Sequence, residues 1–178
     1  MINLTTKSIA ILLILLISTG ISLALEKSIT IGMQLEPPNL NPTAGAAAAI
    51  DEVVYANVFE GLTRFKPDGS ITSALAESWN ISSDGLTYTF YLRSNVEFHD
   101  GTKMTASDVK FSLDRAISED STNAQKALFT DIASVTVIDK QTVQILLKTP
   151  NGGFITSLAW GDAIVVSEKT ISQAETAP

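Results

Sequence analysis

The sequence contains no cysteine and a single histidine among its 178 residues. The lack of cysteine excludes disulfides, thiolate zinc sites, iron–sulfur clusters and cysteine nucleophiles. The one imidazole, His99, excludes a multi-histidine metal site and stands in a Phe-His-Asp-Gly sequence that is typical of a surface turn. No other imidazole is present to activate a serine, so we find no catalytic constellation. We therefore expect a protein that is not an enzyme and that holds neither a metal nor a cofactor.

Positive charge is also scarce. Lys and Arg number 12 against 19 Asp and Glu, which gives a net charge of −7. Binding to nucleic acid requires a basic surface that displaces phosphate counterions, so we expect no nucleic-acid partner. The acidic residues Asp51 and Glu52 are adjacent, but neighbouring helical side chains point about 100° apart. A second pair, Glu119 and Asp120, lies in a polar loop, where acids are ordinarily solvated. We therefore expect neither pair to act in acid–base chemistry.

One long hydrophobic run occurs, near the N-terminus. Nine apolar residues, 9–17, follow the basic Lys7, and the small residues of Ser22-Leu23-Ala24 come soon after. This order is that of a secretory signal peptide, so we predict cleavage after Ala24 and export to the periplasm. The run is shorter than the ~20 residues of a spanning helix, although an uncleaved anchor over residues 9–25 is the alternative. No cysteine follows the cleavage site, so we do not expect a lipoprotein.

Short strands and helices are expected to alternate after the signal peptide. Polar–apolar alternation predicts strands, and apolar spacings of three and four predict helices. Thr105 with Asp108 is close to a capping box, and Asp84-Gly85 is typical of a hairpin turn. The pattern predicts a mixed α+β fold with antiparallel pieces. The expected strands are 28–33, 62–65, 79–81, 86–93, 132–138, 142–148 and 163–166, and the expected helices are 46–59, one capped by Thr105, 154–158 and one capped by Ser167.

Several blocks of sequence occur in a specific order. They are Phe59-Glu60-Gly61-Leu62-Thr63-Arg64-Phe65, then Leu75-Ala76-Glu77-Ser78-Trp79 with Asp84-Gly85-Leu86-Thr87-Tyr88-Thr89-Phe90-Tyr91-Leu92-Arg93, then Val96-Glu97-Phe98-His99-Asp100-Gly101-Thr102, and then Thr105-Ala106-Ser107-Asp108-Val109-Lys110-Phe111-Ser112. Leu40-Asn41-Pro42 precedes them. Together they resemble the family 5 extracellular solute-binding proteins, the dipeptide-, oligopeptide- and nickel-binding components of ABC importers, which usually have Leu-Asp-Pro at the triplet. The resemblance spans residues 29–170.

The resemblance implies an α/β periplasmic-binding-protein-like fold, in which two lobes close on a solute, with an extra domain peculiar to this class. Family members run to several hundred residues, so it also implies an N-terminal fragment without the second lobe. The implied divisions are the signal peptide (1–24), the first strand and cleft loop of the main lobe (25–45), the extra α+β domain (46–158) and the start of the return to the main lobe (159–178).

Four residues are candidates for ligand contact. The loop after the first expected strand is stiffened by prolines, and the resemblance implies that this loop approaches the solute. We therefore expect Glu36, Pro37 and Asn39 to contact a ligand; the alternative is that the prolines only turn the chain. Trp160 is the fourth candidate, with burial in the core as its alternative.

The function implied by the resemblance is delivery of a peptide or peptide-like solute to the permease and ATPase subunits of an ABC importer. We expect the receptor to be a monomer in the periplasm. The alternative is a periplasmic chaperone-like or sensory peptide binder, which would share the fold without docking to a permease. A hydrolase is a third reading, which the missing nucleophile–base pair disfavours.

Overall fold

The computed structural model describes residues 28–43 and 47–171, in two units, Met1–Gln34 and Leu35–Pro178. The predicted signal peptide and its cleavage site lie outside the described residues. In the first unit, the strand expected over residues 28–33 is wrong, because residues 28–34 belong to no helix or strand, and Ile29 and Ile31 are 84% and 74% exposed. Alternation suits a strand, but a strand also needs a neighbour that pairs with its backbone.

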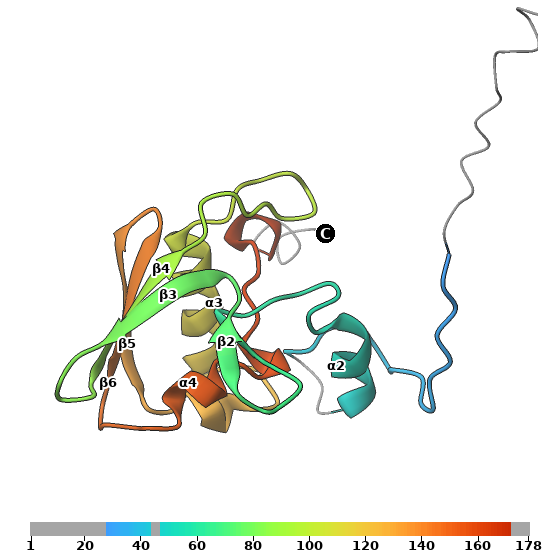
Figure 1. The fold of residues 1–178 in the computed structure, drawn as a ribbon, viewed down its shortest axis with the longest axis horizontal. Helices are drawn as coiled ribbons and strands as arrows, with labels where there is room; N and C mark the ends of the chain where they lie inside the picture. Colours follow the sequence, from blue (N-terminus) through green and yellow to red (C-terminus); the bar gives the residue numbers. More distant parts are fainter. Residues whose placement is uncertain (1–27, 44–46, 172–178) are drawn as a thin grey trace, which may run out of the picture. The chain divides into compact units, whose positions relative to one another are not determined.

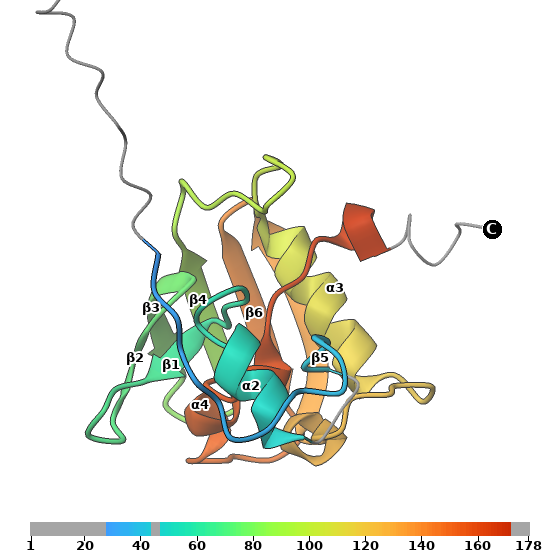
Figure 2. The same ribbon diagram turned by 90° about the vertical axis from the view of Figure 1, so that its right-hand side faces the viewer.

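The second unit is built on a four-stranded antiparallel sheet of order β3-β4-β6-β5 (Figures 1 and 2). Both expected hairpins are confirmed, since β3 pairs with β4 and β5 pairs with β6. One row across the sheet runs through Trp79, Phe90, Val143 and Val137. The strands are β3 (Ala76–Ile81), β4 (Thr87–Leu92), β5 (Ile132–Asp139) and β6 (Thr142–Leu147).

Helix α3 (Ala106–Ile117) covers one face of this sheet (Figure 2). Its start is the predicted capping box: Asp108 Oδ2 accepts hydrogen bonds from the backbone N and the hydroxyl of Thr105, both at 2.9 Å. Alternating residues of β4 and β6 face the helix and form the core with it. Those with at most 5% exposure are Tyr88, Phe90, Leu92, Val143, Ile145, Leu147, Val109 and Leu113.

The hairpin between β3 and β4 closes on a glycine in the left-handed region. Gly85 has φ +69°, and its backbone N donates to Ser82 O at 2.9 Å. Asp84 Oδ1 accepts a hydrogen bond from Leu86 N at 3.0 Å, which holds the turn from its other side. The turn predicted from Asp84-Gly85 is therefore confirmed.

Two expected elements are wrong: the long helix over residues 46–59 and the strand over residues 163–166. The helix expected over residues 46–59 is only α2 (Ala48–Val54), because Tyr55 leaves the helical region at ψ 130° and its hydroxyl donates to Ala159 O at 2.6 Å. The strand expected over residues 163–166 is instead the end of a 3-10 turn followed by a single bridge between Ile164 and Gly61. In both cases a contact distant in sequence overrides the local pattern.

Smaller elements complete the unit, and they agree with the expected short strand near residue 63 and helical turn at residue 154. Residues 168–171 are helical, and Ser167 Oγ accepts a hydrogen bond from Thr170 N at 3.2 Å, as the predicted cap requires. Among the described residues, no helix has the length and apolar character needed to cross a bilayer. The smaller elements are β1 (Thr63–Phe65), β2 (Ile71–Ser73), η1 (Lys126–Phe129), α4 (Phe154–Ser157) and η2 (Gly161–Ala163).

Candidate functional site

The four predicted ligand-contact residues lie at the surface of the second unit. Glu36 and Asn39 are exposed and Pro37 is half-buried. Asn39 Oδ1 accepts a hydrogen bond from Asn41 N at 2.9 Å, so this side chain helps to turn the loop. Trp160 is 48% exposed, and its ring packs edge-on against Phe65 with the ring centroids 5.8 Å apart. The ligand role of these four residues stays a prediction.

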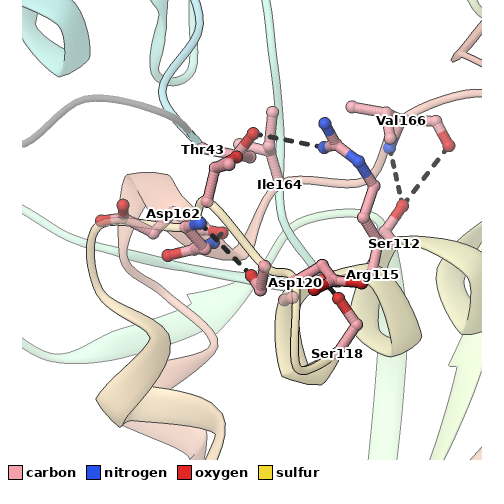
Figure 3. A pocket seen from close by; sticks show the side chains of 12 residues that line it. Thr43, Ser112, Arg115, Ser118, Asp120, Asp162, Ile164 and Val166 are labelled. Carbon is pink, nitrogen blue, oxygen red and sulfur yellow. Dashed lines mark hydrogen bonds between the residues drawn. The ribbon is translucent and has the colours of Figure 1, made fainter. Parts of the chain in front are cut away.

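A polar cavity of about 290 Å³ lies beside the C-terminal half of α3 (Figure 3). None of the four predicted residues lines it. Four separate stretches of chain do: the end of the proline loop, α3, the polar loop after α3, and the segment that follows Trp160. The lining residues are Thr43, Ser112, Arg115, Ala116, Ser118, Asp120, Ser121, Thr122, Asn123, Asp162, Ile164 and Val166.

Ser112 fastens one wall of the cavity to the helix. Its hydroxyl donates to Asp108 O at 2.7 Å, one turn earlier in α3, and accepts a hydrogen bond from Val166 N at 2.9 Å. Asp108 adds a second tie, because its Oδ1 accepts from Glu168 N at 3.2 Å. Residues 164–168 are therefore held along α3 by hydrogen bonds rather than by a strand ladder.

Arg115 brings positive charge to the cavity. Its Nη1 donates to Thr43 Oγ1 at 3.3 Å, and that hydroxyl donates in turn to Asn41 Oδ1 at 2.8 Å. The backbone N of Thr43 also donates to Asn41 Oδ1, at 3.0 Å. This chain of bonds places the end of the proline loop at the rim where the guanidinium lies.

Negative charge enters the cavity at Asp162, which is only 6% exposed. Burial, and to a smaller extent the negative charge of Asp51, raises the pKa of Asp162 from 3.8 to about 6. The Asp51 carboxylate lies against Gly161, where an added Cβ would be 2.5 Å from Oδ1. Burial also raises the pKa of Asp51. Asp51 is half-buried, because its side chain lies against Gly161 at the start of η2.

The cavity combines a guanidinium, carboxylates and several hydroxyls, so it can bind a small polar molecule through hydrogen bonds and charge. A hydroxyl nucleophile needs a base within reach. His99 does not line the cavity, and its Nε2 lies 3.1 Å from Val58 O. Among residues 28–43 and 47–171, no three His, Asp or Glu side chains are grouped so as to hold a metal ion. The arrangement suits binding.

Sequence reasoning missed the residues that give this cavity its charge, Arg115 and Asp162, as well as Thr43. The only local signal was that Asp162 stands two residues after Trp160, in a segment already identified as a candidate for ligand contact. Nothing in the sequence links that segment to Thr43 or to the end of α3. The hydrogen bonds that bring the lining together join residues far apart in the chain: Asn123 and Asp162 are 39 positions apart, and Thr43 and Arg115 are 72 positions apart.

Comparison with known proteins identifies the family. The sequence model of the bacterial extracellular solute-binding proteins, family 5 Middle, matches residues 70–177. Glutathione-binding protein GsiB of Pectobacterium atrosepticum is 38% identical over 125 residues, which are 70% of this chain and 24% of the relative. GsiB of Salmonella typhimurium is 35% identical over 139 residues, 78% of this chain and 26% of the relative. The chain belongs to the family 5 extracellular solute-binding proteins and spans about a quarter of the length of these relatives.

Solved structures show the same relationship at the level of the fold. The PBP AgaA from A. tumefacien R10, in complex with agropinic acid, superposes with a TM-score of 0.75 and 30% identity over 80% of this chain and 29% of that one. NikZ from Campylobacter jejuni, in complex with Ni(L-His), has a TM-score of 0.68 and 34% identity, over 78% of this chain and 27% of that one. DppA from Helicobacter pylori, in complex with the peptide STSA, has a TM-score of 0.66 and 26% identity, over 76% of this chain and 30% of that one. The predicted family and the periplasmic-binding-protein-like α/β fold are confirmed.

Proposed function

We propose that this protein is the solute receptor of an ABC importer and that it binds a peptide or peptide-like solute at the cavity beside α3. The observation that carries the proposal is a polar cavity with charges of both signs on the scaffold of a solute-binding family. The relatives support the solute class, since GsiB is named for glutathione and DppA was solved with the peptide STSA.

The groups in the cavity suit the chemistry of a short peptide. A guanidinium binds a carboxylate with two parallel hydrogen bonds, and Arg115 offers one there. Hydroxyls at Ser118, Ser121 and Thr122 can donate to peptide carbonyls or accept from peptide amides. A volume of about 290 Å³ is at the lower end of small-molecule sites, which favours a solute of a few residues.

The surface candidates remain part of the proposal. Thr43 continues the same proline loop as Glu36, Pro37 and Asn39, and it lines the cavity. A solute larger than the cavity would extend over its rim and could meet that loop. Trp160 is two residues from Asp162 and offers an exposed aromatic face for the same purpose.

Isothermal calorimetry on the complete gene product tests the proposal. The probes are Ala-Ala, Ala-Ala-Ala and glutathione. We expect at least one to bind, and Arg115→Gln to weaken that binding by roughly 10- to 100-fold, the value of a hydrogen bond to a charged group. Arg64→Gln is the matched control, because Arg64 is exposed and does not line the cavity. Absence of binding to every probe, or equal binding by the Arg115→Gln variant, would refute the proposed site.

Transport and export complete the proposed function. Deleting the gene should abolish uptake of the radiolabelled probe that binds best. Unchanged uptake in the deletion strain would argue for the chaperone-like or sensory alternative.

We further propose that the signal peptide is removed after Ala24 and that the receptor is a monomer in the periplasm. N-terminal sequencing of the periplasmic fraction should begin at Leu25. A protein that begins at Met1 and sediments with membranes would contradict export in this form.

A further inference from the structure

Asn151 lies in the connection between β6 and α4, and its side chain joins two parts of the fold. Its Nδ2 donates at 2.7 Å to Oδ2 of Asp131, the residue just before β5. Its Oδ1 accepts a hydrogen bond from Gly153 N at 2.8 Å. Its backbone O accepts from the Tyr88 hydroxyl at 3.0 Å and from Phe154 N at 3.1 Å. Asn151 therefore fastens the start of α4 to the sheet.

The residue after Asn151 is a glycine, and this order makes the asparagine side chain chemically labile. The backbone N of the residue that follows an asparagine can attack the side-chain Cγ, and a glycine has no Cβ to hinder the approach. Of the asparagines in the sequence, Asn151 alone is followed by glycine, whereas the others precede Leu, Pro, Val, Ile or Ala. Asn151 is therefore the asparagine of this chain that is most open to such attack.

The structure permits the reaction at this position. Gly152 is exposed, and among the described residues none accepts a hydrogen bond from its backbone N. The bond from Gly153 N holds Asn151 Oδ1 near the following peptide, and it also supports the negative charge that develops on this oxygen during attack. Asn151 is only half-buried, so a leaving group can reach solvent.

Three Asp-Gly pairs share this arrangement but not its reactivity. Asp68, Asp84 and Asp100 each precede a glycine and accept a hydrogen bond from the backbone N two residues further on. Hydrogen bonds from a neighbouring hydroxyl and from that backbone N lower the pKa of all three carboxyls. An ionised carboxylate is a poor electrophile, so attack by the glycine N is suppressed. The amide of Asn151 is neutral and does not share this protection.

We propose that Asn151 is a site of spontaneous deamidation and that its product replaces the hydrogen bond to Asp131 by repulsion. Gly152 N forms a bond to Asn151 Cγ and loses its proton, while the side-chain nitrogen leaves as ammonia and a succinimide ring remains. Water then opens the ring on one side or the other, which gives aspartate or isoaspartate. Both products carry a carboxylate in place of the amide that donated to Asp131.

The new carboxylate meets a second one. Like charges in contact disfavour the ionised forms of both groups. No basic side chain of the described residues forms an ion pair with Asp131, and the ammonium of Lys148 donates to Thr130 O instead. The start of α4 is then pushed away from the sheet. The contact that loosens next is between the rings of Phe154 and Tyr88, whose centroids are 5.0 Å apart.

Peptide mass spectrometry on the complete gene product tests the reaction. Trypsin should release residues 149–169, in which Asn151 is the only side-chain amide. Incubation of the folded protein at pH 8 should convert this peptide to the aspartate and isoaspartate forms, and Gly152→Ala should slow the conversion several-fold. Alanine fits there, because an added Cβ meets no atom within 4 Å. Conversion that occurs only after unfolding in urea would overturn the proposal.

A second comparison tests the encounter with Asp131. Asn151→Asp reproduces the aspartate product and should lower the thermal midpoint. The exchanged variant, Asp131→Asn with Asn151→Asp, again pairs one amide with one carboxylate and should recover most of the loss. Asn95→Asp is the matched control, because it adds the same charge at an exposed side chain, and it should leave the midpoint nearly unchanged. Equal midpoints for Asn151→Asp and the exchanged variant, or for Asn151→Asp and wild type, would refute the repulsion.

Discussion

Replacing Asp162 by asparagine should stabilise the protein at neutral pH. The folded state holds this carboxyl at a pKa of about 6, against 3.8 for an unperturbed aspartate, and burial is the larger cause. Between these two values the folded protein binds a proton that the unfolded chain has released. Stability therefore falls as the pH rises from about 4 to 6, and it stays at the lower level above the folded pKa. Asparagine cannot ionise, so the variant avoids this loss.

The size of the effect follows from the shift. The difference between 3.8 and about 6 is roughly two pKa units, and each unit corresponds to ~1.36 kcal/mol between the two protonation states. The gain for Asp162→Asn is thus up to about 3 kcal/mol at pH 7.5 and close to zero at pH 4, where the aspartic acid is neutral as well. Asp162 lines a cavity that can hold water, so solvent screening makes this value an upper bound.

Urea unfolding of the wild-type protein and the variant at pH 4, 5, 6 and 7.5 measures the predicted curve. The difference in unfolding free energy should grow with pH over the lower part of this range and then level off. Asp51→Asn is the informative companion, because it removes the smaller cause of the shift and should give a smaller gain of the same sign. A difference that is the same at pH 4 and pH 7.5 would refute the assigned pKa, whatever its size.

Three other substitutions test the geometry. Gly85→Val should cost about 1–3 kcal/mol in stability, because valine is strained at φ +69°, and an unchanged thermal midpoint would contradict the turn. Ser112→Ala should cost about 1–3 kcal/mol by leaving Val166 N without its acceptor, and hydrogen exchange at Val166 should accelerate; protection equal to wild type would show that this bond is unimportant. Gly161→Ala should displace the Asp51 carboxylate and lower the pKa of Asp162 in an NMR titration, whereas an unshifted pKa would mean that Asp51 exerts no influence there.

The elements that sequence reasoning predicted correctly are those in which all the information is local. The β3–β4 hairpin is determined by alternation on both sides of a turn whose glycine has positive φ. The start of α3 is determined by two residues three apart, Thr105 and Asp108, whose side chains bond as a capping box requires. In each case the residues that stabilise the element are within a few positions of one another.

The errors have the opposite cause. The apolar spacing of residues 46–59 suits a longer helix, but the bond from the Tyr55 hydroxyl to Ala159 O joins residues 104 positions apart and draws the chain out of the helix. Residues 163–166 have the composition of a strand, yet their amides find partners on α3 and at Glu60 rather than in a sheet. Periodicity contains no information about such partners.

The candidate site shows the same limit more sharply. Its acidic side requires α2 and η2 to meet, and its basic side requires the proline loop to reach α3. Sequence reasoning left two roles open for Trp160, ligand contact and burial in the core. In the structure Trp160 is half exposed and stands two residues before Asp162. It assigned no role to Asp51, because the contact that partly buries this side chain is with Gly161, 110 positions later.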